Sequence, residues 1–206
     1  VYAEAVRLEV SLTTEAPDMQ AAIEEWGGVI KEALGKAYNA IHFKLVGKLM
    51  THQWNTHTPQ HTQEVYPTFR RQYLDANGIN PMPITIEAKI YHTRCWAIYH
   101  KIYGNWEESY QKMEEVIAFF EQNSVLLEKS FLLYYYVLED LAIVDSDRFN
   151  QKKAKKNIEK IRNYIFSKNS PVLRNDFLKA QVLPHHYYNK LIYCFKFALH
   201  KEALLT

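Results

Sequence analysis

Residues 84–120, ITIEAKIYHTRCWAIYHKIYGNWEESYQKMEEVIAFF, decide the fold, because two helical patterns meet there at a two-residue break. Apolar side chains recur every three or four residues before the break, which predicts a helix over about residues 84–103. The pattern resumes over residues 106–120, where glutamates occupy the opposite face. The side chains that this second helix is expected to turn inward are Tyr110, Met113, Val116, Ile117 and Phe120. Since Gly104-Asn105 leaves room only for a tight turn, the two helices are predicted to form an antiparallel hairpin.

The rest of the chain carries the same kind of pattern, so an all-α fold is predicted. Residues 51–63 are polar and are expected to form a loop, and two prolines mark a seam at residues 77–83. Further helices are expected over residues 2–12, after Asp18, over 37–50, 66–76, 125–144 and 149–166, and from Pro171 and from Pro184 onward. We therefore expect a single all-helical domain over residues 1–206, built from successive antiparallel helix pairs.

The composition excludes several classes of protein. With 48% hydrophobic residues the chain is too apolar to be disordered, and its 6 Gly and 7 Pro are too few for a many-stranded β-sandwich. The most apolar stretch, residues 125–144, contains four charged residues, which argues against a membrane span and for a helix flanked on several sides. Cys95 and Cys194 lie in apolar helical patterns and are expected to be buried free thiols, which favours a reducing cytoplasm. Because the chain begins with Val1 in a helical pattern, we expect it to be a piece of a longer protein.

Residues 90–123 also follow a finer order of bulky and small side chains. The positions that carry this order are Trp96, Ala97, the turn over residues 104–108, Ser109, Met113 and Val116. The order resembles one unit of the tetratricopeptide repeat, a helix-turn-helix unit of 34 residues. Ala97 and Ser109 stand where the two helices of such a unit approach most closely, so a large side chain at either position would force the helices apart.

The resemblance implies a right-handed α-solenoid, in which each hairpin buries its apolar face against its neighbours. Thr93, His100 and Glu121 depart from the tryptophan, tyrosine and proline that are usual in the family. Another kind of helical-pair repeat, or an irregular helical bundle, therefore stays open as the alternative architecture.

Tetratricopeptide proteins generally bind peptides or partner proteins on the concave surface that the first helix of each pair lines. The positions that the same register places on this surface are Tyr91, Arg94, Ile98 and Lys101, continued on the next hairpin by Tyr135 and Glu139. The resemblance thus implies a scaffold that binds a protein or peptide partner and catalyses no reaction.

Charge is segregated along the chain, although the total of 25 basic and 23 acidic residues is nearly neutral. Residues 148–168 carry a net charge of +7 and residues 106–128 a net charge of −5. Lys152, Lys156 and Lys160 repeat every four residues on one helical face, which suggests a nucleic-acid-associated regulator as the alternative function. No aromatic residues interleave with these lysines to stack on bases, which instead favours a solvated face or one that complements an acidic helix of a neighbouring molecule.

A third hypothesis, an enzyme, depends on the histidine-rich loop over residues 52–61, since neutral imidazole is a good zinc ligand. His57 and His61 have the spacing of two ligands on one helical turn, and His52 is nearby, but Pro59 argues against a helix there. No glutamate follows His57 as a metalloprotease motif requires, and no nucleophile elbow, phosphate loop or dinucleotide glycine pattern occurs. We therefore predict no metal, no cofactor and no enzymatic activity.

Overall fold

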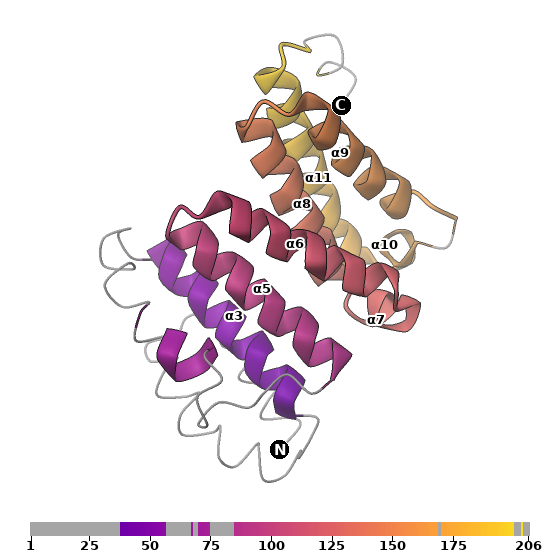
Figure 1. Cartoon of the computed structure of the whole chain (residues 1–206). Helices are drawn as coiled ribbons and strands as arrows, with labels where there is room; N and C mark the ends of the chain where they lie inside the picture. Colours follow the sequence, from indigo (N-terminus) through magenta and orange to yellow (C-terminus); the bar gives the residue numbers. More distant parts are fainter. Residues whose placement is uncertain are drawn as a thin grey trace. The chain divides into compact units, whose positions relative to one another are not determined.

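The structure is a computed structural model that describes residues 38–56, 67, 70–74, 85–168, 170–199 and 203. Every regular element within these ranges is a helix, which confirms the predicted all-α class for this part of the chain (Figure 1). In chain order the elements are α3 (Tyr38–Thr56), the π-helix η2 (Arg70–Leu74), α5 (Ile86–Ile102), α6 (Trp106–Glu121), α7 (Ser124–Lys129), α8 (Phe131–Asp147), α9 (Gln151–Ile165), α10 (Pro171–Arg174) and α11 (Asp176–Lys196).

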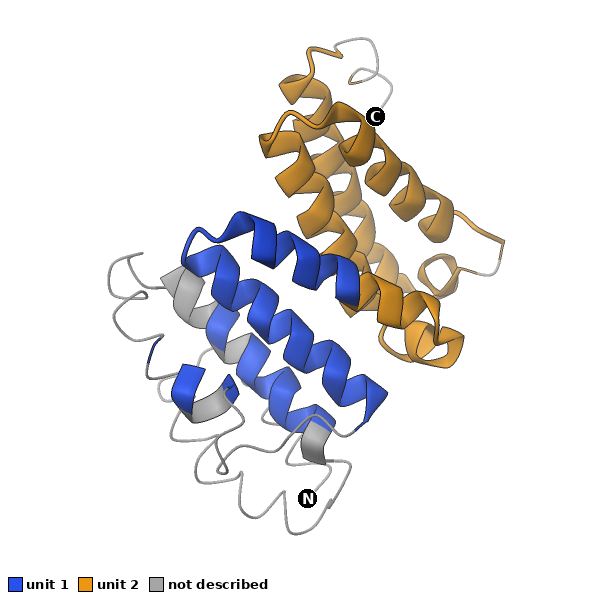
Figure 2. Ribbon diagram, in the orientation of Figure 1, with its two compact units in different colours: residues 1–115 blue, residues 116–206 orange. Residues whose placement is uncertain are grey.

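Packing divides the chain into two compact units, residues 1–115 (unit 1) and residues 116–206 (unit 2) (Figure 2). The division falls inside α6, so this helix contributes residues to both units. It does not fall at the predicted seam over residues 77–83, which lies outside the described residues. Each unit contains a buried apolar cluster of its own.

In unit 1, α3 packs against α5 (Figure 1). A Cβ atom at Gly47 would lie 3.3 Å from Arg94 Nη1 and 3.4 Å from Cys95 Sγ, so glycine allows the two helices to approach closely. The Cys95 thiol donates a hydrogen bond to the carbonyl of Phe43 at 3.3 Å. The buried core that these helices share with η2 consists of Leu45, Val46, Met50, Leu74, Cys95, Tyr99 and Ile102. Helix α3 continues to Thr56, and the Thr51 hydroxyl donates to the carbonyl of Gly47 one turn earlier at 3.0 Å, so the predicted loop is wrong for residues 51–56.

The predicted hairpin of α5 and α6 is confirmed, and its turn lies in unit 1. Gly104 has φ +73°, a left-handed conformation that glycine adopts without strain, and the amide of Asn105 donates to the carbonyl of His100 at 2.9 Å. Ser109 Oγ donates to the carbonyl of Ala97 at 2.8 Å, so the two small residues meet as predicted. The five side chains of α6 that were predicted to face inward are all buried, at 7% exposed or less: Tyr110, Met113, Val116, Ile117 and Phe120.

In unit 2, α8 packs against α7, α9 and α11, as expected for a helix that is apolar nearly all round. The prediction of one helix over residues 125–144 is wrong at Ser130, where φ −122° and ψ 34° leave helical geometry. The amide of Ser130 donates to the carbonyl of Leu126 at 2.9 Å, which is the last helical hydrogen bond of α7 before α8 begins. Serine favours helix ends over helix interiors, which is consistent with this break.

None of the helices that the structure describes is both long and apolar enough to cross a membrane.

Two further helices cover α8. Helix α9 turns Ala154, Ile158, Ile161 and Ile165 toward the core, which is the face its spacing of apolar residues predicts. Helix α11 begins at Asp176, capped by the Asn175 side chain, which accepts a hydrogen bond from the amide of Leu178 at 3.1 Å. The prediction that the last helix begins at Pro184 is therefore wrong, because Pro184 lies inside α11 on its exposed side.

Candidate functional site

The α5 residues that were predicted to line a docking surface do not form an open surface in unit 1. Tyr91 is only 8% exposed, and Ile98 packs against the core that α3 and α5 share. Arg94 and Lys101 are half-buried, and Nη1 of Arg94 lies against α3 near Gly47. The structure therefore corrects the prediction for Tyr91, while Arg94, Ile98 and Lys101 are partly exposed and their role in binding stays a prediction.

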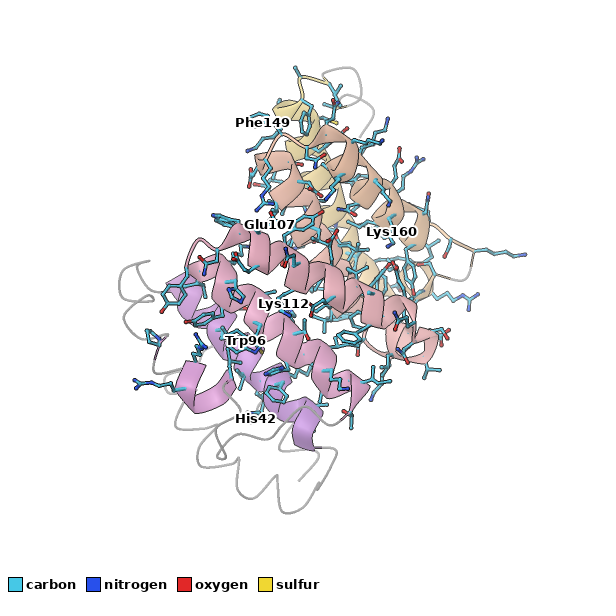
Figure 3. All side chains as sticks on the ribbon, in the orientation of Figure 1. His42, Trp96, Glu107, Lys112, Phe149 and Lys160 are labelled. Carbon is cyan, nitrogen blue, oxygen red and sulfur yellow. The ribbon has the colours of Figure 1, made fainter. Side chains whose placement is uncertain are left out.

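A second side of α5 is covered by η2. The guanidinium of Arg70 lies 5.1 Å from the centre of the Trp96 ring and 5.6 Å from that of Tyr99 (Figure 3 labels Trp96). His92 Nε2 lies 3.4 Å from the carbonyl of Leu74, and burial lowers the pKa of this imidazole. Helix α5 is thus an interior element of unit 1 on the sides that face α3 and η2.

Tyr135 and Glu139 are also interior residues, at 1% and 5% exposed, which corrects their assignment to a docking surface. The Tyr135 hydroxyl oxygen lies 3.0 Å from the carbonyl oxygen of Val182 on α11, and it also contacts the Glu139 carboxyl group. The hydroxyl donates to the carboxyl group of Glu139, which also has a hydrogen bond from the Asn189 side chain, and the Val182 carbonyl is a second acceptor within reach. Burial raises the pKa of Glu139 to about 7, although the hydrogen bonds from Tyr135 and Asn189 act to lower it. The pair links α8 to α11.

The clearest exposed feature of unit 2 is one face of α11. Val182, His186 and Tyr193 lie buried on the inner face of this helix, at 4% exposed or less. Phe177, Tyr188 and Phe195 project from the other side and are 66%, 62% and 68% exposed. We call the row to which they belong the α11 stripe, and it consists of Phe177, Gln181, Pro184, Tyr188, Leu191 and Phe195.

The α11 stripe is a single straight row, because its members alternate at spacings of four and three residues. Leu191 is half-buried and the other five members are exposed. No described residue packs over the three large aromatic side chains closely enough to hide them. Sequence reasoning missed the stripe because it began the last helix at Pro184, which left Phe177 on a different element. The signal was available in the four-three spacing, which continues through Pro184.

The basic face of α9 lies in solvent as predicted. Lys152 and Lys156 are exposed, opposite the buried Ile158. Lys160, labelled in Figure 3, is 37% exposed and forms an ion pair with Glu121 at the end of α6. One lysine of the predicted row is thus paired with the acidic segment of its own chain.

The histidines give no metal site in the described part of the chain. His57 and His61 lie outside the described residues, and for His52 only the backbone, at the end of α3, is described. His185 and His186 diverge, since the first is exposed and the second is 3% exposed. Burial lowers the pKa of His186 to about 4. Among the described residues, no group of three or more His, Cys, Asp or Glu side chains is placed to hold a metal ion.

Comparison of the chain with protein-family models, with curated proteins and with solved structures gives no match. The candidate site is therefore defined by the chemistry of its own residues. That chemistry consists of an exposed aromatic face on α11, a basic face on α9 and a buried carboxyl group between α8 and α11.

Proposed function

We propose that this chain is a helical module that binds a protein or peptide partner and catalyses no reaction. The single observation that carries the proposal is the α11 stripe, with three large aromatic side chains each about two-thirds exposed. Contiguous exposed apolar surface is uncommon on monomeric proteins and marks interaction sites. The docking surface proposed here therefore lies on α11 and replaces the α5 surface expected from the sequence.

The residue types of the stripe suit a binding surface. Aromatic side chains supply a large contact area while few torsion angles have to be fixed, and tyrosine is enriched among residues that dominate binding energy. Tyr188 lies near the middle of the stripe, between Phe177 and Phe195, where a partner would exclude water most completely. Tyr188 is accordingly the residue whose replacement should weaken binding most.

The proposal includes a tetratricopeptide-like arrangement of helical hairpins. The contact between Ser109 and Ala97 supports it, because a unit of that family needs small residues at this crossing. We also propose a cytoplasmic location, which the buried free thiols of Cys95 and Cys194 support.

Capture of partners from a host lysate, followed by mass spectrometry, tests the proposed function. The immobilised wild-type chain should retain a defined set of proteins, and Tyr188→Glu should lose that set while its helical circular dichroism stays unchanged. Asn163→Glu is the matched control, because Asn163 is exposed on α9, away from the stripe. Capture of the same proteins by wild type and by Tyr188→Glu would contradict the proposed surface.

The basic face of α9 favours a second candidate function, binding to a nucleic-acid backbone. Lys152, Lys153, Lys155 and Lys156 are all exposed, and each contact with a phosphate would release counterions. Fluorescence anisotropy with labelled RNA and DNA should then show binding that weakens steeply with salt and with Lys152→Glu and Lys156→Glu together. Binding that ignores both salt and these substitutions would exclude this candidate.

A further inference from the structure

We infer that one end of unit 2 binds the surface of an anionic lipid bilayer, through an exposed phenylalanine and the cations beside it. The inference goes beyond the proposed function, because it names a second surface that is separate from the α11 stripe. We call this end of unit 2 the Phe149 tip, and it consists of Arg148, Phe149, Lys152, Lys153, Lys196 and Phe197. The members come from the turn after α8, the first turn of α9 and the end of α11.

Two contacts bring these segments together. The ring of Phe149, labelled in Figure 3, lies 6.4 Å from the ring of Phe197, and the two planes are perpendicular at 90°. The Lys196 ammonium group forms an ion pair with Asp147, which is 49 residues away in the sequence. Phe197 also packs against a buried core cluster that includes Ala154 of α9. The end of α11 is therefore fixed beside the turn between α8 and α9.

Phe149 projects from this turn. It is 72% exposed, and its φ of 56° is rare for a bulky residue. The backbone holds it in place, since its amide donates to the carbonyl of Ser146 at 3.1 Å and the amide of Asn150 donates to the carbonyl of Asp145 at 2.8 Å. Glycine is the usual residue at this position after a helix. The turn itself thus has no need of a phenylalanine, whereas an exposed apolar ring is a property that a binding surface uses.

Positive charge is concentrated beside Phe149. The four cations of the Phe149 tip are Arg148, Lys152, Lys153 and Lys196. Within residues 147–153 and 195–199, all of which the structure describes, Asp147 is the single carboxylate, so the local net charge is +3. The nearly neutral total charge of the chain conceals this patch. An anionic surface is the partner whose charge is complementary to it.

The apolar residues of this end favour a lipid surface over a nucleic acid. After Phe197, which is partly exposed, the chain continues with the exposed Ala198 and the partly exposed Leu199. Alanine and leucine do not stack on bases as aromatic rings do, whereas the apolar zone of a bilayer accepts all of these side chains. Anionic lipids are concentrated in the cytoplasmic leaflet, which agrees with the cytoplasmic location proposed above.

The composition of the Phe149 tip indicates weak and reversible binding. Each cation close to an anionic membrane should strengthen binding by about fivefold. Transfer of the Phe149 ring into the apolar zone should strengthen it by about tenfold. Because most of the attraction is then electrostatic, binding should require anionic lipid and should weaken as salt is added.

Co-sedimentation of the full chain with phosphatidylcholine vesicles, with and without phosphatidylserine, tests the role of the charges. Wild type should bind only the vesicles that contain phosphatidylserine, and Lys152→Glu with Lys153→Glu should lower the partition coefficient by about tenfold or more. The control pair Arg162→Glu with Lys168→Glu makes the same change of charge at exposed positions about 15 Å or more from Lys152, and should lower it much less. Absence of wild-type binding, or an equal loss in both pairs, overturns the inference.

Phe149→Gly separates binding from folding. Glycine adopts the positive φ without strain, so the variant should resist urea at least as well as wild type. Its vesicle partition coefficient should nevertheless fall by about tenfold. Phe149→Leu keeps an apolar side chain and should bind vesicles within about threefold of wild type. Unchanged vesicle binding by Phe149→Gly shows that the ring does not enter the bilayer and overturns the inference.

The inference and the proposed function can fail separately. Tyr188→Glu should lose captured proteins but bind vesicles nearly as wild type does, because Tyr188 lies on the α11 stripe and outside the Phe149 tip. If wild type binds no vesicles while Tyr188→Glu loses captured proteins, the inference is overturned and the proposed function stands. Binding of wild type to single-stranded RNA but not to vesicles, with loss of RNA binding in Phe149→Leu, assigns the Phe149 tip to nucleic acid and also overturns the inference.

Discussion

Ser109 Oγ donates a hydrogen bond to the backbone carbonyl of Ala97 at 2.8 Å, and the two residues are 1% and 3% exposed. The hydroxyl thereby links the first turn of α6 to the second half of α5. The side chain at position 109 also has to be small, because α5 and α6 approach closely at this contact and a larger side chain would push them apart. Ser109 therefore has two roles, as a spacer and as a hydrogen-bond donor, and these can be separated by substitution.

Ser109→Ala keeps the small side chain and removes the donor, so it should lower the free energy of unfolding by about 1 kcal/mol. Ser109→Leu also overpacks the crossing and should cost about 1 to 3 kcal/mol more. Urea denaturation measures both values. Ser124→Ala, at an exposed position, is the control and should change stability little. Equal stabilities of the alanine and leucine variants would show that the helices do not approach closely at this position.

Ala198 has φ 53°, in the left-handed region that costs alanine more than glycine. It follows the end of α11, where the amide of Leu199 donates to the carbonyl of Cys194 at 2.8 Å. Ala198→Gly should therefore raise the free energy of unfolding by about 1 kcal/mol. The same substitution at Ala118, exposed inside α6, should lower it by about 1 kcal/mol. Thermal melts of the two variants should shift in opposite directions, and a shared direction would contradict the assignment of Ala198.

Glu139→Gln should change the pH dependence of stability. The pKa of Glu139 is about 7 in the folded chain, against an ordinary 4.5, so the folded chain holds a proton that the unfolded chain releases between these values. Stability due to this proton is complete below about pH 4.5 and is lost as the pH rises through about 7. Relative to Glu139→Gln, wild type should lose on the order of 3 kcal/mol over this interval, as measured by urea denaturation.

The comparison with Glu139→Gln is needed because His186 acts in the opposite sense. Burial lowers the pKa of His186 to about 4, so its contribution to stability is lost as the pH falls toward that value. Both chains contain His186, and its effect cancels in their difference. Asn163→Gln, on the exposed side of α9, changes no titratable group and should parallel wild type at every pH. If Glu139→Gln also parallels wild type, burial does not raise the pKa of Glu139 in the folded chain.

The ion pair between Lys160 and Glu121 should contribute only modestly to stability, because both side chains are partly exposed. Lys160→Ala should cost less than about 1 kcal/mol at low salt, and the difference should vanish near 1 M salt, where screening is strong. Lys155→Ala serves as the matched control on the same helix. A loss that persists at high salt would instead point to packing by the lysine stem.

Turn chemistry shows how far the sequence could predict the fold. Gly104 marks the end of α5 in the sequence, since glycine adopts φ +73° freely. Phe149 (Figure 3) has φ 56° at the end of α8, and Ala198 has a similar value after α11, although neither residue type favours that conformation. Neither turn is marked by a residue type that favours its conformation, so local patterns could not predict it.

The candidate site was less predictable than the helices. The spacing of Ile158 and Ile161 gave the inner face of α9 correctly, because burial and periodicity agree there. Tyr135 and Glu139 were expected on a surface because the register of the repeat resemblance placed them there, but they are hydrogen-bonded to each other in the interior, where Tyr135 also contacts Val182. Such pairing depends on α11, which is distant in sequence. The α11 stripe was not predicted because proline usually ends or kinks a helix, whereas α11 stays helical through Pro184.

Each unit contains a buried free cysteine, whose reaction with a thiol reagent would show when that unit opens. Cys95 lies in unit 1 at 0% exposed and Cys194 in unit 2 at 1% exposed, and neither is in a disulfide. Burial also raises the pKa of the Cys95 thiol to about 12, which keeps it in the unreactive protonated form. An alkylating reagent should therefore label each sulfur only when its surroundings open, and mass spectrometry of the two labelled peptides would time the opening of each half separately.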